Sequence, residues 1–157
     1  VTITGAGADK TTFGTVVFES GANSEATVVV RYAGSGTHAD NVNWVIGEGS
    51  RVNAVVDADW ALDTVHVGQQ SIVVKRDATL RHHVATFGGE VVRITPRLAF
   101  AAPGGDAELI VVFGASAIAA RSSPAWALSV RPASHSATVR EASASISRSA
   151  MTLRMSG

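Results

Sequence analysis

The sequence has 157 residues, 13 Lys and Arg against 13 Asp and Glu, no cysteine and 46% hydrophobic residues. This length accommodates one domain with a modest core, and the lack of cysteine excludes disulfides, thiolate metal sites and a cysteine nucleophile in this chain. Neither a signal-peptide pattern nor an apolar run of about 20 residues occurs, so no secretion or membrane span is predicted and the cytoplasm is the expected location.

The neutral total combines two unlike parts. Residues 1–114 contain eight Lys and Arg against twelve Asp and Glu, whereas residues 115–157 contain five Arg and one Glu. The first part has no basic patch mixed with aromatic residues, so a nucleic-acid interface is not supported. We therefore expect a core domain over residues 1–114 and a separate Ala-, Ser- and Arg-rich tail over residues 115–157.

Short segments rich in β-branched and aromatic residues follow one another up to Phe113. The expected strands are Thr15–Phe18, Ala26–Tyr32, Val42–Ile46, Arg51–Val56, Thr64–Val67, Ser71–Lys75, Leu80–Phe87, Glu90–Thr95, Leu98–Ala101 and Ala107–Phe113. Turn-forming residues separate these strands at Gly47–Gly49, Asp57–Asp59, Gly68, Asp77, Gly88–Gly89, Pro96 and Pro103–Gly105. No segment among them has a helical period, so the core domain is predicted to be all-β.

Two architectures fit this spacing of strands and turns. An antiparallel β-sandwich needs tight hairpins, for which Gly88–Gly89 is the one good two-residue candidate. A β-solenoid needs only bends, and two strand–turn units per coil would make the turns at residues 47–49, 68 and 88–89 recur at about 20 residues. The spacing favours the solenoid, with the antiparallel sandwich as the alternative.

Five phrases occupy the bends and strand starts of the central region. They are GSGTHADN (34–41), VHVGQQ (65–70), DATLRH (77–82), GGEVVR (88–93) and PGGDAEL (103–109). In this order they resemble the central part of the SufB/SufD family, and SufD-like members more closely, over about residues 14–113.

This resemblance implies both a fold and a role. The implied fold is a right-handed parallel β-helix, and the implied role is that of a non-catalytic scaffold in SUF iron–sulfur cluster assembly. The implied partners are a SufB-like paralogue and the SufC ATPase. The iron–sulfur cluster would belong to the assembled complex, and no cofactor is expected on this chain.

Histidines are the strongest candidates for metal ligands. Alternation along a strand puts His82 and His83 on opposite faces, so they cannot ligate one ion together. His66 would have to reach such a site from a neighbouring coil, and zinc or non-haem iron needs three convergent ligands. His38, two residues before Asp40, is interpreted as part of a Gly- and Ser-rich turn. We expect one histidine near the core, the others at the surface, and no metal site.

Other candidate motifs give weaker evidence for a functional site. The stretch Val1–Lys10 (VTITGAGADK) is similar to the start of a dinucleotide-binding turn, but Lys10 replaces the third glycine and a strand-like segment follows instead of a helix. No Gly-x-Ser-x-Gly nucleophile motif occurs. The sequence therefore predicts neither nucleotide binding nor nucleophilic catalysis.

Three aspartates support an alternative function. Asp57 and Asp59 are interpreted as solvated carboxylates of a turn and not as a metal pair. If they share a face with Asp77, they are the residues on which a carbohydrate-binding or polysaccharide-degrading β-helix would depend. The aromatic residues near plausible strand surfaces, which are Tyr32, Trp44 and Trp60, are too few to suggest a sugar-stacking groove.

The tail reads as a different kind of sequence. Ala and Ser make up half of residues 115–157, which predicts an irregular, disordered or weakly helical segment. Because the family resemblance is not visible after Gly114, it implies a partial scaffold. An altered reading frame near Gly114, or a truncated inactive product, would explain this. An uncapped end of a β-helix is expected to be association-prone.

Overall fold

The computed structural model describes residues 1–114, 138–142 and 148–156, and every regular element in these residues is a β-strand. The strands are β1 (Thr2–Thr4), β2 (Thr11–Glu19), β3 (Glu25–Gly34), β4 (Thr37–Ile46), β5 (Arg51–Trp60), β6 (Val65–Val74), β7 (Thr79–Gly88), β8 (Val91–Phe100), β9 (Asp106–Gly114), β10 (Thr138–Ala142) and β11 (Arg148–Ser156). From β2 onward, more and less exposed residues alternate along most strands, as the two-residue period of a strand requires.

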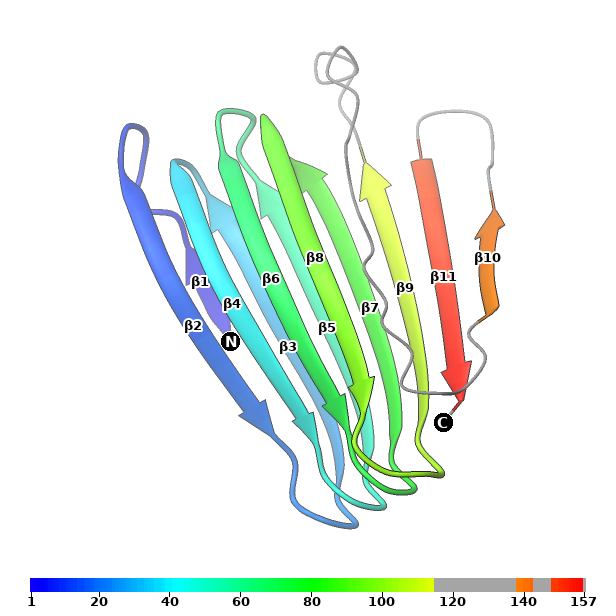
Figure 1. The fold of residues 1–157 in the computed structure, drawn as a ribbon. Helices are drawn as coiled ribbons and strands as arrows, with labels where there is room; N and C mark the ends of the chain where they lie inside the picture. The colour runs from blue at the N-terminus through cyan, green and yellow to red at the C-terminus, as the bar shows by residue number, and fades with distance from the viewer. Residues whose placement is uncertain (115–137, 143–147, 157) are drawn as a thin grey trace.

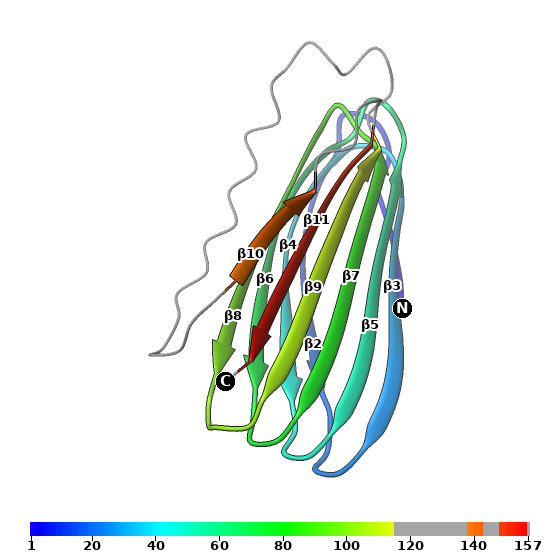
Figure 2. The ribbon, with the colours of Figure 1, turned by 90° about the vertical axis from the view of Figure 1, so that its right-hand side faces the viewer.

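Successive strands belong alternately to two sheets. Strands β2, β4, β6 and β8 form one sheet, and β3, β5, β7 and β9 lie side by side in the other (Figures 1 and 2). Neighbours in both of these sets are parallel. The chain therefore winds as a parallel β-helix of about four turns, which confirms the predicted solenoid. The antiparallel sandwich considered as the alternative is wrong.

Each coil is longer than the spacing of glycines predicts. Thr11 pairs with Thr37, and Thr37 pairs with Val65, so the repeat clearly exceeds the predicted interval of about 20 residues. The predicted turns at Gly68 and Pro96 are wrong, because both residues lie inside single ten-residue strands, β6 and β8. Pro96 is tolerated because β8 is an edge strand of its sheet, where a missing N–H leaves no ladder partner unsatisfied.

The corners that follow the strands of the four-stranded sheet have a common backbone conformation. A residue of positive φ recurs once per coil, at Asn23 (53°), Gly49 (64°), Asp77 (53°) and Gly104 (83°). Glycine, asparagine and aspartate are the residues that adopt this conformation most readily. Backbone hydrogen bonds join successive corners, including 2.7 Å from Asn23 N to Glu48 O and 2.9 Å from Gly49 N to Arg76 O. The turn residues of the sequence thus define a stacked corner.

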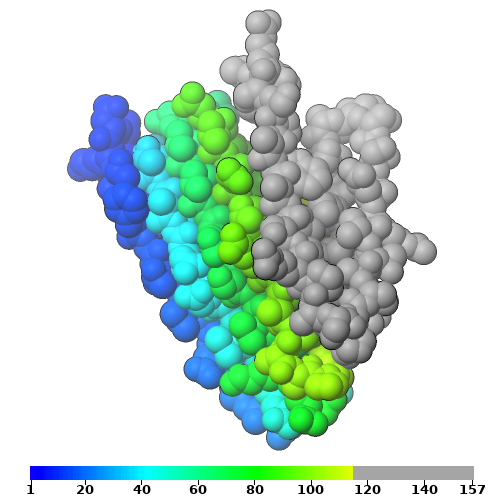
Figure 3. Space-filling model, in the orientation of Figure 1, coloured from blue at the N-terminus to red at the C-terminus, as the bar shows by residue number. Residues whose placement is uncertain are grey.

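The space between the two sheets is filled by the inward-facing side chains. Trp44, Ile46, Val56 and Leu80 are completely buried there. Burial of these apolar surfaces is the main favourable contribution to folding. On the outside, the strands of successive coils form adjacent bands across one face of the molecule (Figure 3). No described segment forms a helix with the length and apolarity that a membrane span requires.

Two strands lie in the described part of the tail. β11 pairs with β9 in the antiparallel direction, and β10 pairs with β11 in the same way. These segments are therefore strands, where the composition predicts an irregular or weakly helical chain. The expectations for residues 115–137, 143–147 and 157 fall outside the described residues.

Candidate functional site

A cluster of polar side chains lies inside the β-helix, at the start of strands β4 and β6. His38 and Asp40 are two residues apart on β4, so both point inward, and His66 is the register partner of His38 on β6. The side chains of His66 and Asp40 are each 1% exposed and that of His38 is 5% exposed. We call His38, Asp40 and His66 the interior triad.

Asp40 is the centre of the hydrogen-bond network. Its Oδ1 lies 3.1 Å from His66 Nε2, and its Oδ2 accepts a hydrogen bond from the hydroxyl of Tyr32 on β3. The indole Nε1 of Trp60 donates to His66 Nδ1 at 3.0 Å. Because an indole only donates, neutral His66 carries its hydrogen on Nε2 and donates it to Asp40. The carboxylate thus receives two hydrogen bonds in a nearly water-free environment.

The surroundings shift the acidities of these groups. Burial alone raises the pKa of Asp40, but hydrogen bonds from His66 and Tyr32, and attraction by His66 and His38, outweigh it and bring the pKa below its ordinary value. Burial, the hydrogen bond to Asp40 and the charge of Asp40 all raise the pKa of Tyr32. Asp40 is therefore ionised and Tyr32 is a neutral donor at physiological pH.

His38 is held on one side only. Its Nδ1 lies 2.7 Å from the hydroxyl oxygen of Thr12 on β2. Its Nε2 is buried without a hydrogen-bond partner and lies 3.7 Å from Asp40 Oδ2. Burial lowers the pKa of His38, and the attraction of Asp40 only partly offsets this effect.

Two glycines flank Asp40 on the neighbouring strands. In register, Gly14 of β2 and Gly68 of β6 stand on either side of Asp40. A Cβ at Gly68 would lie 2.8 Å from Asp40 Oδ1, so the carboxylate needs the space that this glycine leaves. A Cβ at Gly14 would lie 3.7 Å from Asp40 Cβ and 3.7 Å from His38 Cε1, in ordinary van der Waals contact with the triad.

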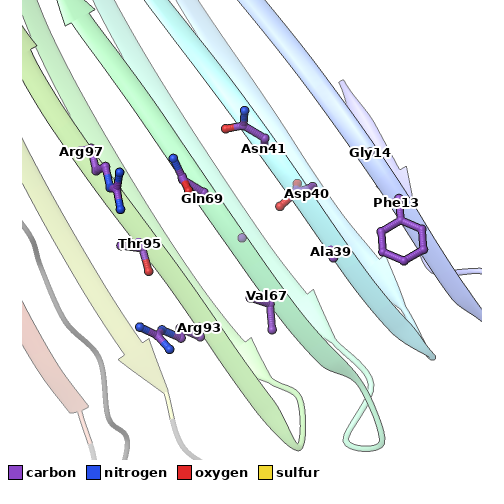
Figure 4. Close-up of a pocket in the computed structure, with 11 residues that line it drawn as sticks. Phe13, Gly14, Ala39, Asp40, Asn41, Val67, Gln69, Arg93, Thr95 and Arg97 are labelled. Atoms are coloured by element: carbon purple, nitrogen blue, oxygen red, sulfur yellow. The ribbon is translucent and has the colours of Figure 1, made fainter.

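A shallow pocket of about 490 Å³ lies over these glycines on the outer face of the four-stranded sheet. Phe13, Val67 and Arg93 lie along its lower side, and Arg97 lies farther up β8 (Figure 4). The pocket is lined by both glycines and by Asp40, so no side chain at residues 14 and 68 lies between the pocket and Asp40.

A second polar group lies deeper in the core. His82 of β7 is fully buried, and its Nε2 lies 2.5 Å from Gln70 Oε1 of β6. Its ring meets the ring of Trp44 edge-on, with centroids 5.3 Å apart. Burial, together with a smaller effect of His83, lowers the pKa of His82 to about 4. This histidine is neutral in the folded protein at physiological pH.

The predicted positions of the histidines were partly right. His82 and His83 point to opposite faces, as alternation predicts, with His82 buried and His83 partly exposed. The prediction that only one histidine lies near the core is wrong, because His38, His66 and His82 are all buried. The interpretation of His38 as part of a turn is also wrong, since it lies inside strand β4.

The three aspartates do not form a site together. Asp57 and Asp59 lie in strand β5 and not in a turn, on its outward face, and Asp57 pairs with Arg31 at 3.5 Å. Asp77 stands apart from them at a corner with positive φ. The predicted shared face of three carboxylates is wrong. After Val1–Lys10, strand β2 begins at Thr11, so the segment that follows is a strand, as the sequence predicts, and not the helix that a dinucleotide site requires.

The interior triad was missed because the coil length was misjudged. The register between β4 and β6 aligns His38-Ala39-Asp40 with His66-Val67-Gly68. In that alignment two histidines share one interior row, and a glycine stands beside the aspartate. A search for histidines recurring at the interval that separates Thr37 from Val65 would have found this row.

Comparison with known proteins identifies the family of this chain. Residues 2–139 match the family described as "SUF system FeS cluster assembly, SufBD core domain". This chain belongs to the SufBD family. The match continues past Gly114, where the visible resemblance ends, so the family pattern extends into the tail.

Curated relatives support the same family. An iron–sulfur cluster assembly SufBD family protein of Mycobacterium leprae is 46% identical over 89 residues, which are 57% of this chain and 23% of that protein. A protein of the same description from Mycobacterium bovis is 40% identical over 113 residues, 72% of this chain and 28% of that protein. The chain thus spans about a quarter of the length of these SufBD relatives. No solved structure matches it.

Proposed function

We propose that this chain is a SufD-like, non-catalytic scaffold segment of the SUF iron–sulfur cluster assembly machinery, working in the cytoplasm. Its partners in this proposal are a SufB-like paralogue and the SufC ATPase. Membership of the SufBD family supports the setting of cluster assembly. Because the chain spans only 23% to 28% of its curated relatives, the activity of the complete protein enters here by inference from the family.

The observation that carries the scaffold role is the stack of parallel coils. Between β2 and β9, each interior strand of a sheet is hydrogen-bonded to the strands one coil before and one coil after it. The polar groups of the interior triad face one another inside this stack and are 1% to 5% exposed. A surface that is held rigid from coil to coil is suited to docking other subunits.

Co-purification tests this role. A tagged form of the chain is co-expressed with the SufB-like paralogue and SufC, and the recovered proteins are identified by mass spectrometry. We expect the paralogue, and SufC with it, to be retained in near-stoichiometric amounts. Recovery of the folded chain without either partner would contradict the proposal.

A matched pair of glycine variants tests whether retention of the partner proteins depends on the stacking of the coils. In Gly88→Ala, the new Cβ would lie 2.0 Å from the backbone oxygen of Trp60 on the adjacent coil, at a residue of positive φ. In Gly21→Ala, no atom lies within 4 Å of the new Cβ. We expect Gly88→Ala to lose the partners and Gly21→Ala to retain them.

A further inference from the structure

We propose that the interior triad binds one divalent transition metal ion of the class of zinc and ferrous iron. The ligand atoms of His38, Asp40 and His66 all lie within 4.8 Å of one another. Three protein ligands with an open fourth position are the usual set for such an ion. The scaffold role neither requires nor explains this site, so the inference is independent of it.

The spacing of the triad matches a coordination sphere. His66 Nε2 and Asp40 Oδ1 are 3.1 Å apart, and His38 Nε2 and Asp40 Oδ2 are 3.7 Å apart. Ligand atoms at about 2.0–2.2 Å from a tetrahedral ion stand about 3.3–3.6 Å from one another. The two histidine–aspartate distances thus lie close to this range, and all three ligand atoms lie within 4.8 Å of one another, so side-chain rotations of about an ångström would bring them around one ion.

The chemistry of the donors selects the class of ion. Two imidazole nitrogens and one carboxylate form the ligand set of many zinc and non-haem iron centres. Calcium and magnesium prefer oxygen ligands almost exclusively, and the triad offers a single carboxylate. Asp40 supplies the one carboxylate of the set, and its side chain is 1% exposed between the two histidines.

His38 supplies an independent observation that points to a ligand. Its Nε2 has no hydrogen-bond partner although the side chain is only 5% exposed, and a buried polar atom of this kind is costly unless something binds it. The Thr12 hydroxyl lies 3.3 Å from Thr37 O, to which it donates, so its oxygen can accept a hydrogen from His38 Nδ1. This arrangement leaves the lone pair of Nε2 free for a metal, as outer partners of ligating histidines do.

Gly14 lies beside the unpartnered nitrogen of His38. A Cβ at this position would lie 3.9 Å from His38 Nε2 and 3.7 Å from the Cβ of Asp40. A larger side chain there would occupy the volume beside the unpartnered nitrogen. The glycine thus keeps a side chain from crowding the unpartnered nitrogen of His38.

Trp60 competes with the metal for His66. Its N–H donates to His66 Nδ1, so the ring hydrogen of His66 lies on Nε2 in the metal-free protein. Metal binding moves that hydrogen to Nδ1, and the hydrogen bond from Trp60 is then lost. Removing the indole N–H should therefore strengthen metal binding.

Titration with Co²⁺, which replaces zinc and has visible absorption bands, tests the site in the full 157-residue chain. We expect saturation at one equivalent, displacement by Zn²⁺, and a rise in melting temperature with either ion. X-ray absorption of the zinc-loaded wild-type protein should show two imidazole ligands, a result that does not depend on any variant folding.

Four variants separate the triad from adventitious binding. His38→Phe keeps an aromatic ring against Tyr32 and Trp60, whose centroids lie 5.9 and 5.7 Å from that of His38. It and Asp40→Asn should weaken binding more than about 100-fold, beyond the 10- to 100-fold loss typical of an outer-shell change. His83→Phe, on the outer face of β7, should bind as the wild type does, and Trp60→Phe should bind more tightly.

Three results would overturn the proposal. These are the absence of saturable Co²⁺ binding by the folded wild type, an absorption spectrum without imidazole ligands, and unchanged binding by a folded His38→Phe protein. Loss of binding in His83→Phe alone would assign the ion to the surface and would equally reject the interior site.

Discussion

The polar residues at and around the interior triad are organised around one charge. Asp40 stays ionised inside the β-helix because Tyr32 and His66 donate hydrogen bonds to it. A buried carboxylate without such donors would be strongly destabilising. Tyr32, Trp60 and His66 therefore serve as supports for Asp40 as much as they serve as core residues.

His82 makes stability depend on pH. Its pKa is about 4 in the folded chain against 6.5 when unfolded. Below pH 6.5 the unfolded chain binds a proton that the folded chain does not, so stability is complete above this pH and falls until about pH 4. The total loss from this residue is on the order of 3 kcal/mol.

Urea unfolding at pH 6.5 and pH 5 measures this effect. We expect His82→Leu to lose about 2 kcal/mol less than the wild type between these two values, whatever its stability at neutral pH. The contribution of His38 to the pH dependence of stability is the same in both proteins, so it cancels in the comparison. His83→Leu, on the opposite face of β7, removes only the smaller contribution of His83 to the lowered pKa of His82, so its pH dependence should stay close to that of the wild type. Equal slopes in His82→Leu and the wild type would show that His82 is not the group responsible.

At the scale of elements, the corners specify the coil. The backbone at Gly47 packs directly against the preceding corner, since a Cβ there would lie 2.4 Å from Ser20 O and 2.5 Å from Gly21 O. Ser50 supports the same corner by donating to Gly47 O at 2.6 Å, and Ser20 Oγ accepts from Gly47 N at 2.7 Å. These contacts set the distance between consecutive coils at this edge.

Gly47→Ala should therefore destabilise the protein by about 1–3 kcal/mol, the usual cost of overpacking against atoms that cannot move aside. Gly21→Ala, at the facing corner, has nothing within 4 Å of the new Cβ and should change stability by less than about 0.5 kcal/mol. Thermal or urea unfolding of the two variants measures the difference. If Gly47→Ala and Gly21→Ala were equally stable, the corners would not be tightly stacked.

At the scale of the whole molecule, the β-helix has open edges. β2 ends its sheet, so one row of its backbone hydrogen-bonding groups has no partner strand among the described residues. Phe13 and Val17 on the same strand are 82% and 65% exposed. An exposed, apolar edge strand readily pairs with another chain.

We expect the chain to self-associate in a concentration-dependent manner when no partner is present. Sedimentation velocity should show this association, and Val17→Lys should reduce it by placing a charge on the edge strand. Leu62→Lys changes a residue that is 60% exposed in a turn and should have no effect. A monomer at all concentrations would contradict the prediction that the β2 edge is available.

Local patterns in the sequence determined the strands and corners. Alternating apolar residues identified most of the strands, and Gly47–Gly49, Asp77, Gly88–Gly89 and Pro103–Gly105 marked true bends, because both signals act between residues close in the chain. The family phrases then selected the parallel β-helix over the sandwich. The turns predicted at Gly68 and Pro96 were wrong, since a glycine beside a buried carboxylate and a proline on an edge strand are compatible with an uninterrupted strand.

Only the tertiary structure decided which polar residues meet. His38, Asp40 and His66 come together because the register between β4 and β6 places His38 opposite His66, an offset set by the packing of whole coils and by no local pattern. Trp60 and Tyr32 reach the same group from the opposite sheet. The sequence determines which side chains a strand directs into the interior. The stacking of one coil on the next determines which other side chains they contact there.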